Sequence, residues 1–385
     1  MSATARQLLA YLTARQAEMT RALESLSRLE SPSHDPEAQK PVFSLLAAEL
    51  SRLGFAVRRL AGRTTGGQLW AVPGNRPRGR PAQLLLGHCD TVWPIGTLAR
   101  MPVHRRNGRL YGPGVYDMKA GLVQGIFALQ ALAALGLEPP LTPAVFINSD
   151  EELGSADCLQ RLHCLARHVR RVFVLEPSLG AEGRLKTRRK GSLRFTVRVY
   201  GRAAHSGLDP EKGASAVEEL ARVVTALYGL AAPERGVTVN VGVVEGGLRA
   251  NVVAPEARAE VDVRVVTTAD AERLEAAVLA MEPRTPGTRL EISGGIDRPP
   301  LEATPGNRGL WNAALRCAAA LGLEIEEGTA GGASDGSLTS RLVPTLDGLG
   351  AVGDGAHAEH EHVVLDRMPE RAALLALLLM EPDRP

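Results

Sequence analysis

The sequence has 385 residues, more than one hydrophobic core usually supports, so we expect two domains. Its hydrophobic content of 44% and charged content of 23% are typical of a soluble globular protein, and no apolar run reaches membrane-spanning length. The net charge is +2, and the basic residues are 40 arginines and 5 lysines. Because the arginines are scattered and aromatic residues are scarce, we expect no nucleic-acid partner.

The N-terminal 29 residues predict an amphipathic helix rather than a signal peptide, because no continuous apolar segment follows the first residues. The apolar positions of this helix are Leu8, Leu9, Tyr11, Leu12 and Leu23. The cysteines are Cys89, Cys158, Cys164 and Cys317. Their spacing fits neither a zinc knuckle nor a disulfide framework, so we expect reduced cysteines and a cytoplasmic protein without a membrane partner.

A second helix is predicted at residues 39–53, and strand segments follow at 56–60 and 68–72. The apolar run at 84–86 then leads into a glycine, which predicts a strand buried on both faces, as in a parallel sheet. His88 and Asp90 follow two positions apart, so their side chains point the same way at the end of this strand. Taken alone, such a pair is more often an ordinary hydrogen bond than a functional site.

Two more apolar strands, at residues 144–148 and 172–175, also end in acidic residues. The first is followed by Asp150, Glu151 and Glu152, and the second by Glu176. Between the strands lie the turn-rich segment 109–119, which contains Asp117, an apolar helix at 120–135 and a helix at about 158–168. The alternation of strands and helices predicts a largely parallel sheet covered by helices. Each carboxylate alone fits a helix cap or a surface turn, but ligands of such sheets bind beyond the strand ends, so a shared site is favoured.

From residue 191 the order of elements changes to β-α-β-β-α-β, which is that of a ferredoxin-like domain. Its expected strands are 193–200, 236–245, 257–266 and 288–293, and its expected helices are 213–230 and 269–281. The basic stretch 184–190 and the proline-rich stretch 297–305 are the expected hinges. A helix at 309–322 and a strand at 344–349 return to the first domain. We therefore expect a catalytic domain of residues 1–190 and 299–385, interrupted by an insertion of residues 191–298.

Two neighbouring divalent ions require carboxylate and imidazole ligands, with at least one bridging carboxylate. The candidates are His88, Asp117, Glu151, Glu152, Glu176 and one histidine of residues 357–362. This set offers each ion about three protein ligands and leaves room for a bridging water. One carboxylate must stay unligated to accept the proton of that water. Glu151 and Glu152 are neighbours that point in different directions, which suits one ligand and one base.

Five motifs occur in a characteristic order along the chain. They are GHCDTV at 87–92, GPGVYDMK at 112–119, DEELGS at 150–155, EP at 176–177 and GRAAHSG at 201–207. In this order they resemble the co-catalytic di-zinc amidohydrolases, a family that includes bacterial glutamate carboxypeptidase, acetylornithine deacetylase, succinyl-diaminopimelate desuccinylase and aminoacylase. The chain is most similar to glutamate carboxypeptidase, and the match extends from about residue 40 to the end.

The resemblance implies two zinc ions per chain, for which cobalt or manganese are possible substitutes. It implies that Asp117 bridges the ions, that His88 and Glu176 complete one site, and that Glu152 and a late histidine complete the other. The late histidine should follow a glycine-rich loop, which points to His357, while His360 and His362 are expected at the solvated surface. By the same resemblance, Glu151 is the general base, Asp90 orients His88, and the peptide bond after Asp117 is cis.

For the inserted domain the resemblance implies a homodimer, in which His205 reaches an active site across the interface and stabilises the oxyanion. Asn251 and Arg298 match positions that hold the substrate carboxylate. The expected reaction is hydrolysis of an amide bond next to a free carboxylate, with release of a C-terminal, glutamate-like amino acid. The alternatives are an N-acyl-amino-acid deacylase or desuccinylase and, less favoured, an inactive metal-binding protein that would not need Glu151 or His205.

Overall fold

The computed structural model describes residues 2–383, and the contacts between residues divide the chain into two units. Unit 1 consists of Met1–Thr187, Ala303–Ala330 and Ser334–Pro385. Unit 2 consists of Arg188–Glu302 and Gly331–Ala333. Unit 1 is thus built from chain segments on both sides of unit 2.

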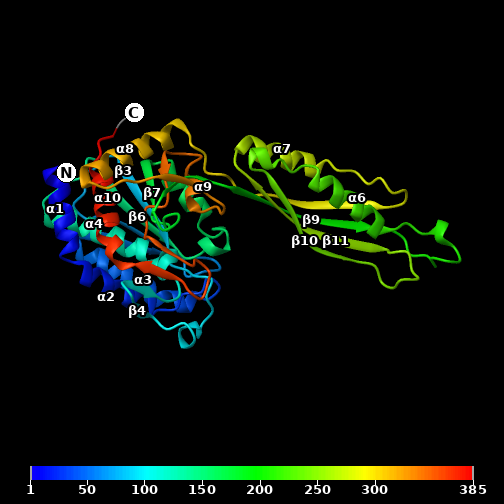
Figure 1. The fold of residues 1–385 in the computed structure, drawn as a ribbon, viewed down its shortest axis with the longest axis horizontal. Coiled ribbons are helices and arrows are strands. Elements are labelled where there is room, and N and C mark those ends of the chain that lie inside the picture. Colours follow the sequence, from blue (N-terminus) through cyan, green and yellow to red (C-terminus); the bar gives the residue numbers. More distant parts are fainter. Residues whose placement is uncertain (1, 384–385) are drawn as a thin grey trace. The chain divides into compact units, whose positions relative to one another are not determined.

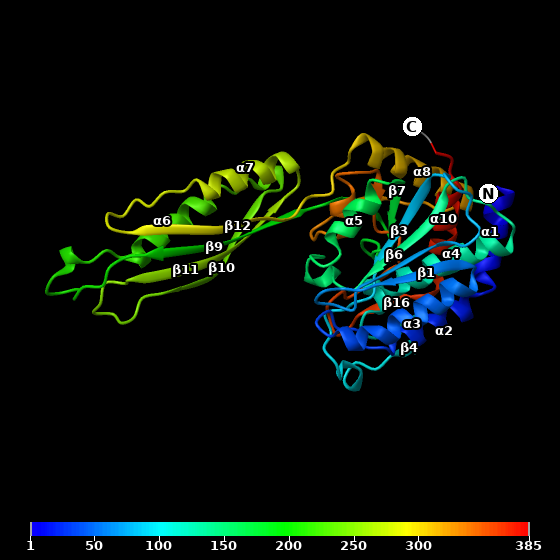
Figure 2. The same ribbon diagram turned by 180° about the vertical axis from the view of Figure 1, so that it is seen from behind.

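Unit 1 contains a six-stranded sheet with the strand order β1-β2-β6-β3-β7-β14 (Figures 1 and 2). The strands are β1 (Phe55–Leu60), β2 (Gln68–Pro73), β3 (Ala82–His88), β6 (Thr142–Asn148), β7 (Val169–Val174) and β14 (Thr345–Leu346). Strand β3 pairs in parallel with β6 and β7, and β14 pairs in parallel with β7. The antiparallel pairs are β1 with β2 and β2 with β6, and the predicted largely parallel sheet is confirmed.

Helices cover both faces of this sheet. Successive residues of each central strand point to opposite faces, so they enter two different hydrophobic cores. Leu85 packs into the core beneath one group of helices, whereas Leu84 and Leu86 pack into the core beneath the other. The first group is α1 (Ala3–Thr13), α2 (Gln16–Ser27), α3 (Pro36–Arg52), α4 (Ala120–Ala134), α8 (Pro305–Leu321) and α10 (Met368–Met380). The second is α5 (Leu159–Ala166) and α9 (Asp335–Thr339). The N-terminal segment forms two helices rather than the one expected, with a turn at Ala14 and Arg15.

Two smaller sheets of unit 1 join segments that are far apart in the sequence. β4 (His104–Arg106), β5 (Arg109–Tyr111), β15 (Gly353–Asp354) and β16 (His362–Val364) form a sheet of order β15-β16-β5-β4. It places the histidine-rich segment beside the loop that carries Asp117. β8 (Leu185–Arg189) pairs with β13 (Glu327–Ala330), so residues 184–190, which we expected as a hinge, are mostly a strand, and the boundary between the two units falls within it. The basic residues of β8 suggested an exposed segment, although Leu185 and Thr187 are buried.

Unit 2 is a four-stranded antiparallel sheet of order β10-β11-β9-β12, with α6 and α7 on one face (Figure 1). Its elements are β9 (Gly191–Tyr200), α6 (Ala216–Tyr228), β10 (Thr238–Gly246), β11 (Glu256–Val265), α7 (Thr268–Leu279) and β12 (Arg289–Arg298). Alternate residues of β9 and β11 enter the core beneath the helices. This is the ferredoxin-like arrangement that the order of elements predicted. Short 3₁₀ turns lie at Thr97–Ala99, Pro210–Lys212, Pro233–Arg235 and Leu365–Arg367.

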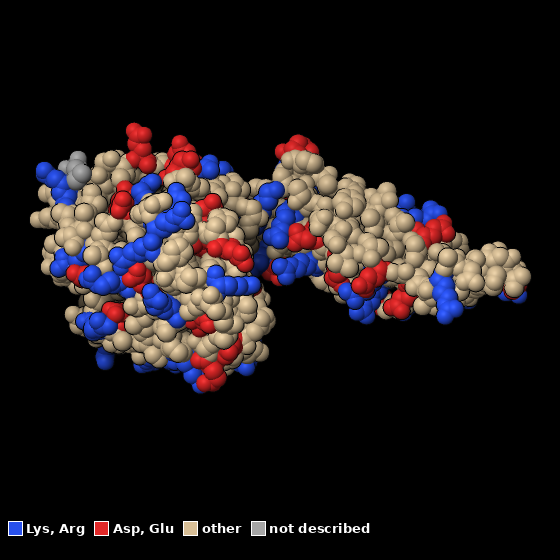
Figure 3. All heavy atoms as spheres, turned by 60° about the horizontal axis from the view of Figure 1, so that its bottom comes forward, with Lys and Arg blue, Asp and Glu red and all other residues tan. Residues whose placement is uncertain are grey.

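Within residues 2–383, no helix has both the length and the apolar character that crossing a membrane requires. Figure 3 shows one face of the molecule, where the side chains of Lys and Arg are interspersed with those of Asp and Glu. The expected absence of a nucleic-acid partner stays a prediction.

Candidate active site

The candidate site lies where three parallel strands of unit 1 end. β3 ends at His88, which is paired with Asn148 at the end of β6. Beyond β6 a short 3₁₀ turn, η3 (Glu151–Leu153), carries Glu151, and Glu176 follows the end of β7. One ligand atom from each of His88, Glu151 and Glu176 lies within 4.8 Å of the others, and the same holds for His88, Asp117 and Glu152. The structure thus brings together residues that are up to 88 positions apart.

Asp117 lies between two histidines. Its Oδ1 is 3.4 Å from Nε2 of His88, and its Oδ2 is 3.6 Å from Nε2 of His357. Nε2 of His88 is also 3.4 Å from Oε1 of Glu176, and Nε2 of His357 is 3.1 Å from Oε1 of Glu152. Each oxygen of Asp117 therefore faces its own histidine–glutamate pair, which is the geometry expected of a bridging carboxylate.

Two buried atoms at the centre of this cluster lack hydrogen-bond partners among residues 2–383. They are Nε2 of His88 and Oδ1 of Asp117. Burial raises the pKa of the Glu152 carboxyl. Burial alone would lower the pKa of His88, but Asp117, Asp90 and Glu176 raise it well above its usual value. Carboxylates packed this closely need a compensating cation, so the residues present fit bound divalent metal ions.

Asp90 connects the histidine to the acidic turn. Nδ1 of His88 lies 3.3 Å from Oδ1 of Asp90 and 3.1 Å from the main-chain oxygen of the same residue. The carboxylate also accepts hydrogen bonds from the main-chain N–H groups of Glu151 and Glu152, at 3.3 and 3.2 Å. Ser33, which no sequence motif indicated, donates to Oδ2 at 2.7 Å. Asp90 can therefore fix the His88 ring and the position of η3 together.

The loop that carries Asp117 includes an irregular helical turn, η2 (Val115–Lys119). The peptide bond between Asp117 and Met118 is cis, as the resemblance implied. The buried carboxylate of Glu361 contacts this loop. Burial raises the pKa of Glu361 to about 7, although the N–H groups of the loop lower it.

Two further residues near the site differ from expectation. His362 was expected at the surface, but it is buried at the start of β16, where its ring lies 5.1 Å from that of Tyr111. His360 is exposed as expected. Lys186, which was not selected as a site residue, is buried in β8, and its Nζ lies 4.0 Å from Oε2 of Glu176.

His205, Asn251 and Arg298 lie on unit 2. Nδ1 of His205 accepts hydrogen bonds from the main-chain N–H groups of Gly207 and Leu208, at N···N distances of 3.1 and 3.2 Å. A neutral ring must then carry its proton on Nε2, and this exposed residue can donate it. Asn251 is exposed, and Arg298 is buried at the end of β12. Their expected roles at the metal site of unit 1 stay predictions.

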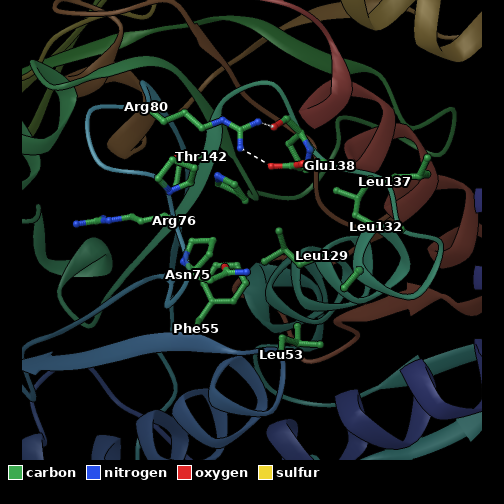
Figure 4. A pocket seen from close by; sticks show the side chains of 16 residues that line it. Leu53, Phe55, Asn75, Arg76, Arg80, Leu129, Leu132, Leu137, Glu138 and Thr142 are labelled. Carbon is green, nitrogen blue, oxygen red and sulfur yellow. Dashed lines mark hydrogen bonds and ion pairs between the residues drawn. The ribbon is translucent and has the colours of Figure 1, made fainter.

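A cavity of about 470 Å³ lies elsewhere on unit 1, near the start of β6 (Figure 4). Leu129, Leu132 and Phe55 contribute to an apolar wall. At its rim Arg80 forms an ion pair of 2.6 Å with Glu138. The lining contains no histidine, and its one carboxylate, that of Glu138, is paired with Arg80, so the cavity lacks the groups that hydrolysis requires.

Comparison with known proteins agrees with this geometry. Residues 84–381 match the profile of the peptidase family M20/M25/M40, which is more than half of the chain. The chain belongs to peptidase family M20/M25/M40. The family expected from the motifs is thus confirmed, and the protein is an enzyme of the metallopeptidase and amidohydrolase type.

Individual M20/M25/M40 relatives differ in their reactions. The chain is 29% identical over 382 residues to carboxypeptidase G2 of Pseudomonas sp. (strain RS-16), which covers 96% of this chain and 90% of the relative. It is also 29% identical over 374 residues to a succinyl-diaminopimelate desuccinylase of Delftia acidovorans, covering 90% and 94%. The crystal structure of aminopeptidase PepT from Bacillus cereus has the same fold, with a TM-score of 0.80, 21% identity, and coverage of 95% and 98%. Membership of the family does not therefore define the substrate.

Proposed function

We propose that the enzyme hydrolyses an amide bond next to a free carboxylate and releases a C-terminal, glutamate-like amino acid. The observation that carries this proposal is the Asp117 carboxylate, which faces His88 with one oxygen and His357 with the other. We assign the metal ligands to His88, Asp117, Glu152, Glu176 and His357. Two zinc ions, or cobalt or manganese in their place, would supply the positive charge that polarises a carbonyl and makes water more acidic.

Glu151 is the proposed general base. Its main-chain N–H is held by Asp90, and a carboxylate atom of Glu151 is within reach of His88 and Glu176. It would accept a proton from the attacking water and later deliver it to the leaving amine. Asp90 would keep the His88 ring in the orientation that metal binding requires.

The carboxypeptidase assignment is supported by the similarity to carboxypeptidase G2 over nearly the whole chain. The second candidate is an N-acyl-amino-acid deacylase or desuccinylase, which the similarity to succinyl-diaminopimelate desuccinylase supports. Both reactions use the same proposed metal ligands. A hydrolysis screen over dipeptides and N-acyl amino acids, with zinc, cobalt or manganese added, separates them. An inactive metal-binding protein is disfavoured, because such a protein would not need Glu151.

The free cysteines of the described residues support a reducing compartment, and Cys164 is exposed without forming a disulfide. We therefore propose that the enzyme acts in the cytoplasm.

The substrate carboxylate is proposed to pair with Arg298, with Asn251 as an additional amide donor. A guanidinium binds a carboxylate through two parallel hydrogen bonds, and losing one charge-assisted contact costs about 1.5–3 kcal/mol. Arg298→Ala should therefore lower kcat/KM by roughly ten- to a hundredfold. Esterification of the α-carboxylate should lower kcat/KM of the wild type comparably and have little further effect on the variant. Steady-state kinetics on the acid and its methyl ester measures both effects.

Arg289→Ala is the matched control, because Arg289 lies on the same strand but is exposed and paired with Glu291. It should leave the preference for the free acid unchanged. Since Arg298 is buried, circular dichroism and thermal unfolding must show that Arg298→Ala is folded. Arg298→Lys, which keeps the charge but not the planar fork, provides a second comparison. Equal hydrolysis of the acid and the ester by the wild type would refute the carboxypeptidase assignment.

We also propose a homodimer that forms through unit 2. β10 is an edge strand of its sheet, and Val243 and Val244 on this strand are exposed. In such a dimer, His205 of the partner subunit would donate its Nε2 proton to the oxyanion of the reaction.

His205→Ala should reduce kcat without loss of metal. Mixing this inactive variant with inactive Glu151→Gln subunits should restore part of the activity, because a mixed dimer contains one site with both groups intact. Activity after subunit exchange, verified by mass spectrometry of differently tagged chains, is the measurement. A verified mixed dimer without activity would show that His205 does not serve the partner's site.

A further inference from the structure

Glu361 is a buried carboxylate that has no assigned place among the metal ligands, yet it accepts four hydrogen bonds. Only 1% of the residue is exposed. Its Oε1 accepts the main-chain N–H groups of Tyr116 and Asp117, at 2.9 and 3.0 Å. Its Oε2 accepts the main-chain N–H of Gly114 at 2.8 Å and the indole N–H of Trp93 at 3.0 Å. Both oxygens are thus fully used by the protein itself.

Three of these donors belong to the loop that presents Asp117. The loop turns at Gly114, whose φ is +70°, and enters helix α4 at Ala120. N–H groups that precede the first turn of a helix have no acceptor within the helix. Glu361 supplies that acceptor from another part of the chain. The path of the loop, and hence the position of the Asp117 carboxylate, depends on this contact.

The same residue fixes the segment that carries His357. Glu361 follows His357 by four positions, and its main-chain N–H donates to the oxygen of Ala358 at 3.0 Å. Its main-chain oxygen accepts the N–H of Gly112 at 3.3 Å. The next residue, His362, begins β16. Side chain and main chain of Glu361 therefore bind the Asp117 loop to the His357 segment.

The φ of His357 is +61°, a conformation that non-glycine residues adopt only when their surroundings hold them there. Its side chain is half exposed, so packing around the ring contributes little to its orientation. The segment is held before His357 by β15, which pairs with β16, and after His357 by Glu361.

We propose that Glu361 is a positioning residue of the metal centre, which holds the Asp117 loop and the His357 segment at the separation that lets both side chains bind the same ion. This role of Glu361 rests on the metal site proposed above. Replacing a residue that hydrogen-bonds to a metal ligand typically lowers metal affinity by about 10- to 100-fold.

Glu361→Gln tests this proposal. The amide group that replaces one oxygen is itself a donor, so two of the four N–H groups lose their acceptor. Metal affinity is measured by competition between the protein and a chromogenic chelator for zinc, and the cobalt-substituted protein gives an absorption spectrum that reports ligand geometry. We expect affinity for at least one ion to fall by about 10- to 100-fold, with an altered cobalt spectrum. Glu359→Gln is the control, because Glu359 is exposed two positions away.

Trp93→Phe removes one donor and leaves the carboxylate in place, so it should weaken metal binding in the same direction but by no more than about tenfold. This variant keeps the test decisive if Glu361→Gln fails to fold. Wild-type zinc affinity and an unchanged cobalt spectrum in the folded variants, with only a lower Tm of the metal-free protein, would overturn the proposal. A wild type that binds no zinc would instead refute the metal site itself, and the two failures are thereby distinguished.

Discussion

Glu151→Gln should lower kcat by at least about a hundredfold, the lower end of general-base contributions, while metal content hardly changes. The substitution keeps the size of the side chain and removes its ability to accept a proton. In the structure Glu151 is only partly buried, and its position in η3 is held through its main-chain N–H by Asp90. The turn should therefore stay in place without the side-chain charge. Steady-state kinetics and metal analysis on the same sample give the two quantities.

Glu152→Gln is the matched comparison, since the two residues are neighbours on the same turn. The carboxylate of Glu152 is 3.1 Å from Nε2 of His357, as expected of a shared metal ion. This variant should lose metal together with activity. If Glu152→Gln keeps both ions while Glu151→Gln loses one, the two roles are reversed.

Asp117→Ala should abolish activity and weaken the binding of both metal ions by well over about a hundredfold, because even residues that only support a ligand contribute 10- to 100-fold. Replacing a residue that binds one ion should cause the loss of that ion alone, whereas replacing a bridging carboxylate should weaken the binding of both ions. Treatment of the wild type with a chelator should abolish activity in the same way. Isothermal titration of the metal-free variant with zinc, and metal analysis after dialysis, provide the measurement.

Asp354→Ala is a suitable control, since Asp354 is an exposed carboxylate on β15 in the same unit. Metal-free Asp117→Ala should remain folded, because the ligands follow the ends of strands in a sheet with its own hydrophobic core. Two tightly bound ions per chain of Asp117→Ala would contradict the bridging assignment.

The sequence predicted the central part of the site because each strand end is marked locally. An apolar run followed by His88, or by Glu176, shows both the strand and the side chain beyond it. Parallel pairing then brings the ends to one edge, as β3, β6 and β7 show. The ferredoxin-like unit was predictable for a similar reason, since helical and strand periodicities alternate along it.

The remaining features depend on contacts that have no local pattern. Nothing near Glu361 in the sequence indicates four N–H donors from residues more than 200 positions away. The burial of His362 results from its pairing with β5, and His360, two positions earlier, is exposed. Strand β8 was missed because its arginines and lysine suggested solvent, although Lys186 lies against Glu176. Such tertiary pairings override the composition of short segments.

The division of unit 1 into separate chain segments has a consequence for synthesis on the ribosome. Helix α4 comes from the first segment and packs against α10 from the last, and β14 and His357 also belong to the last. Unit 2, apart from residues 331–333, is complete once residue 302 has been made. At about 5–20 residues per second, α10 follows it by roughly 4–16 s. During this interval the ferredoxin-like unit can fold, while α4 packs against α1 and α2 but lacks the cover that α10 provides. A nascent chain at this stage has no complete metal centre to load.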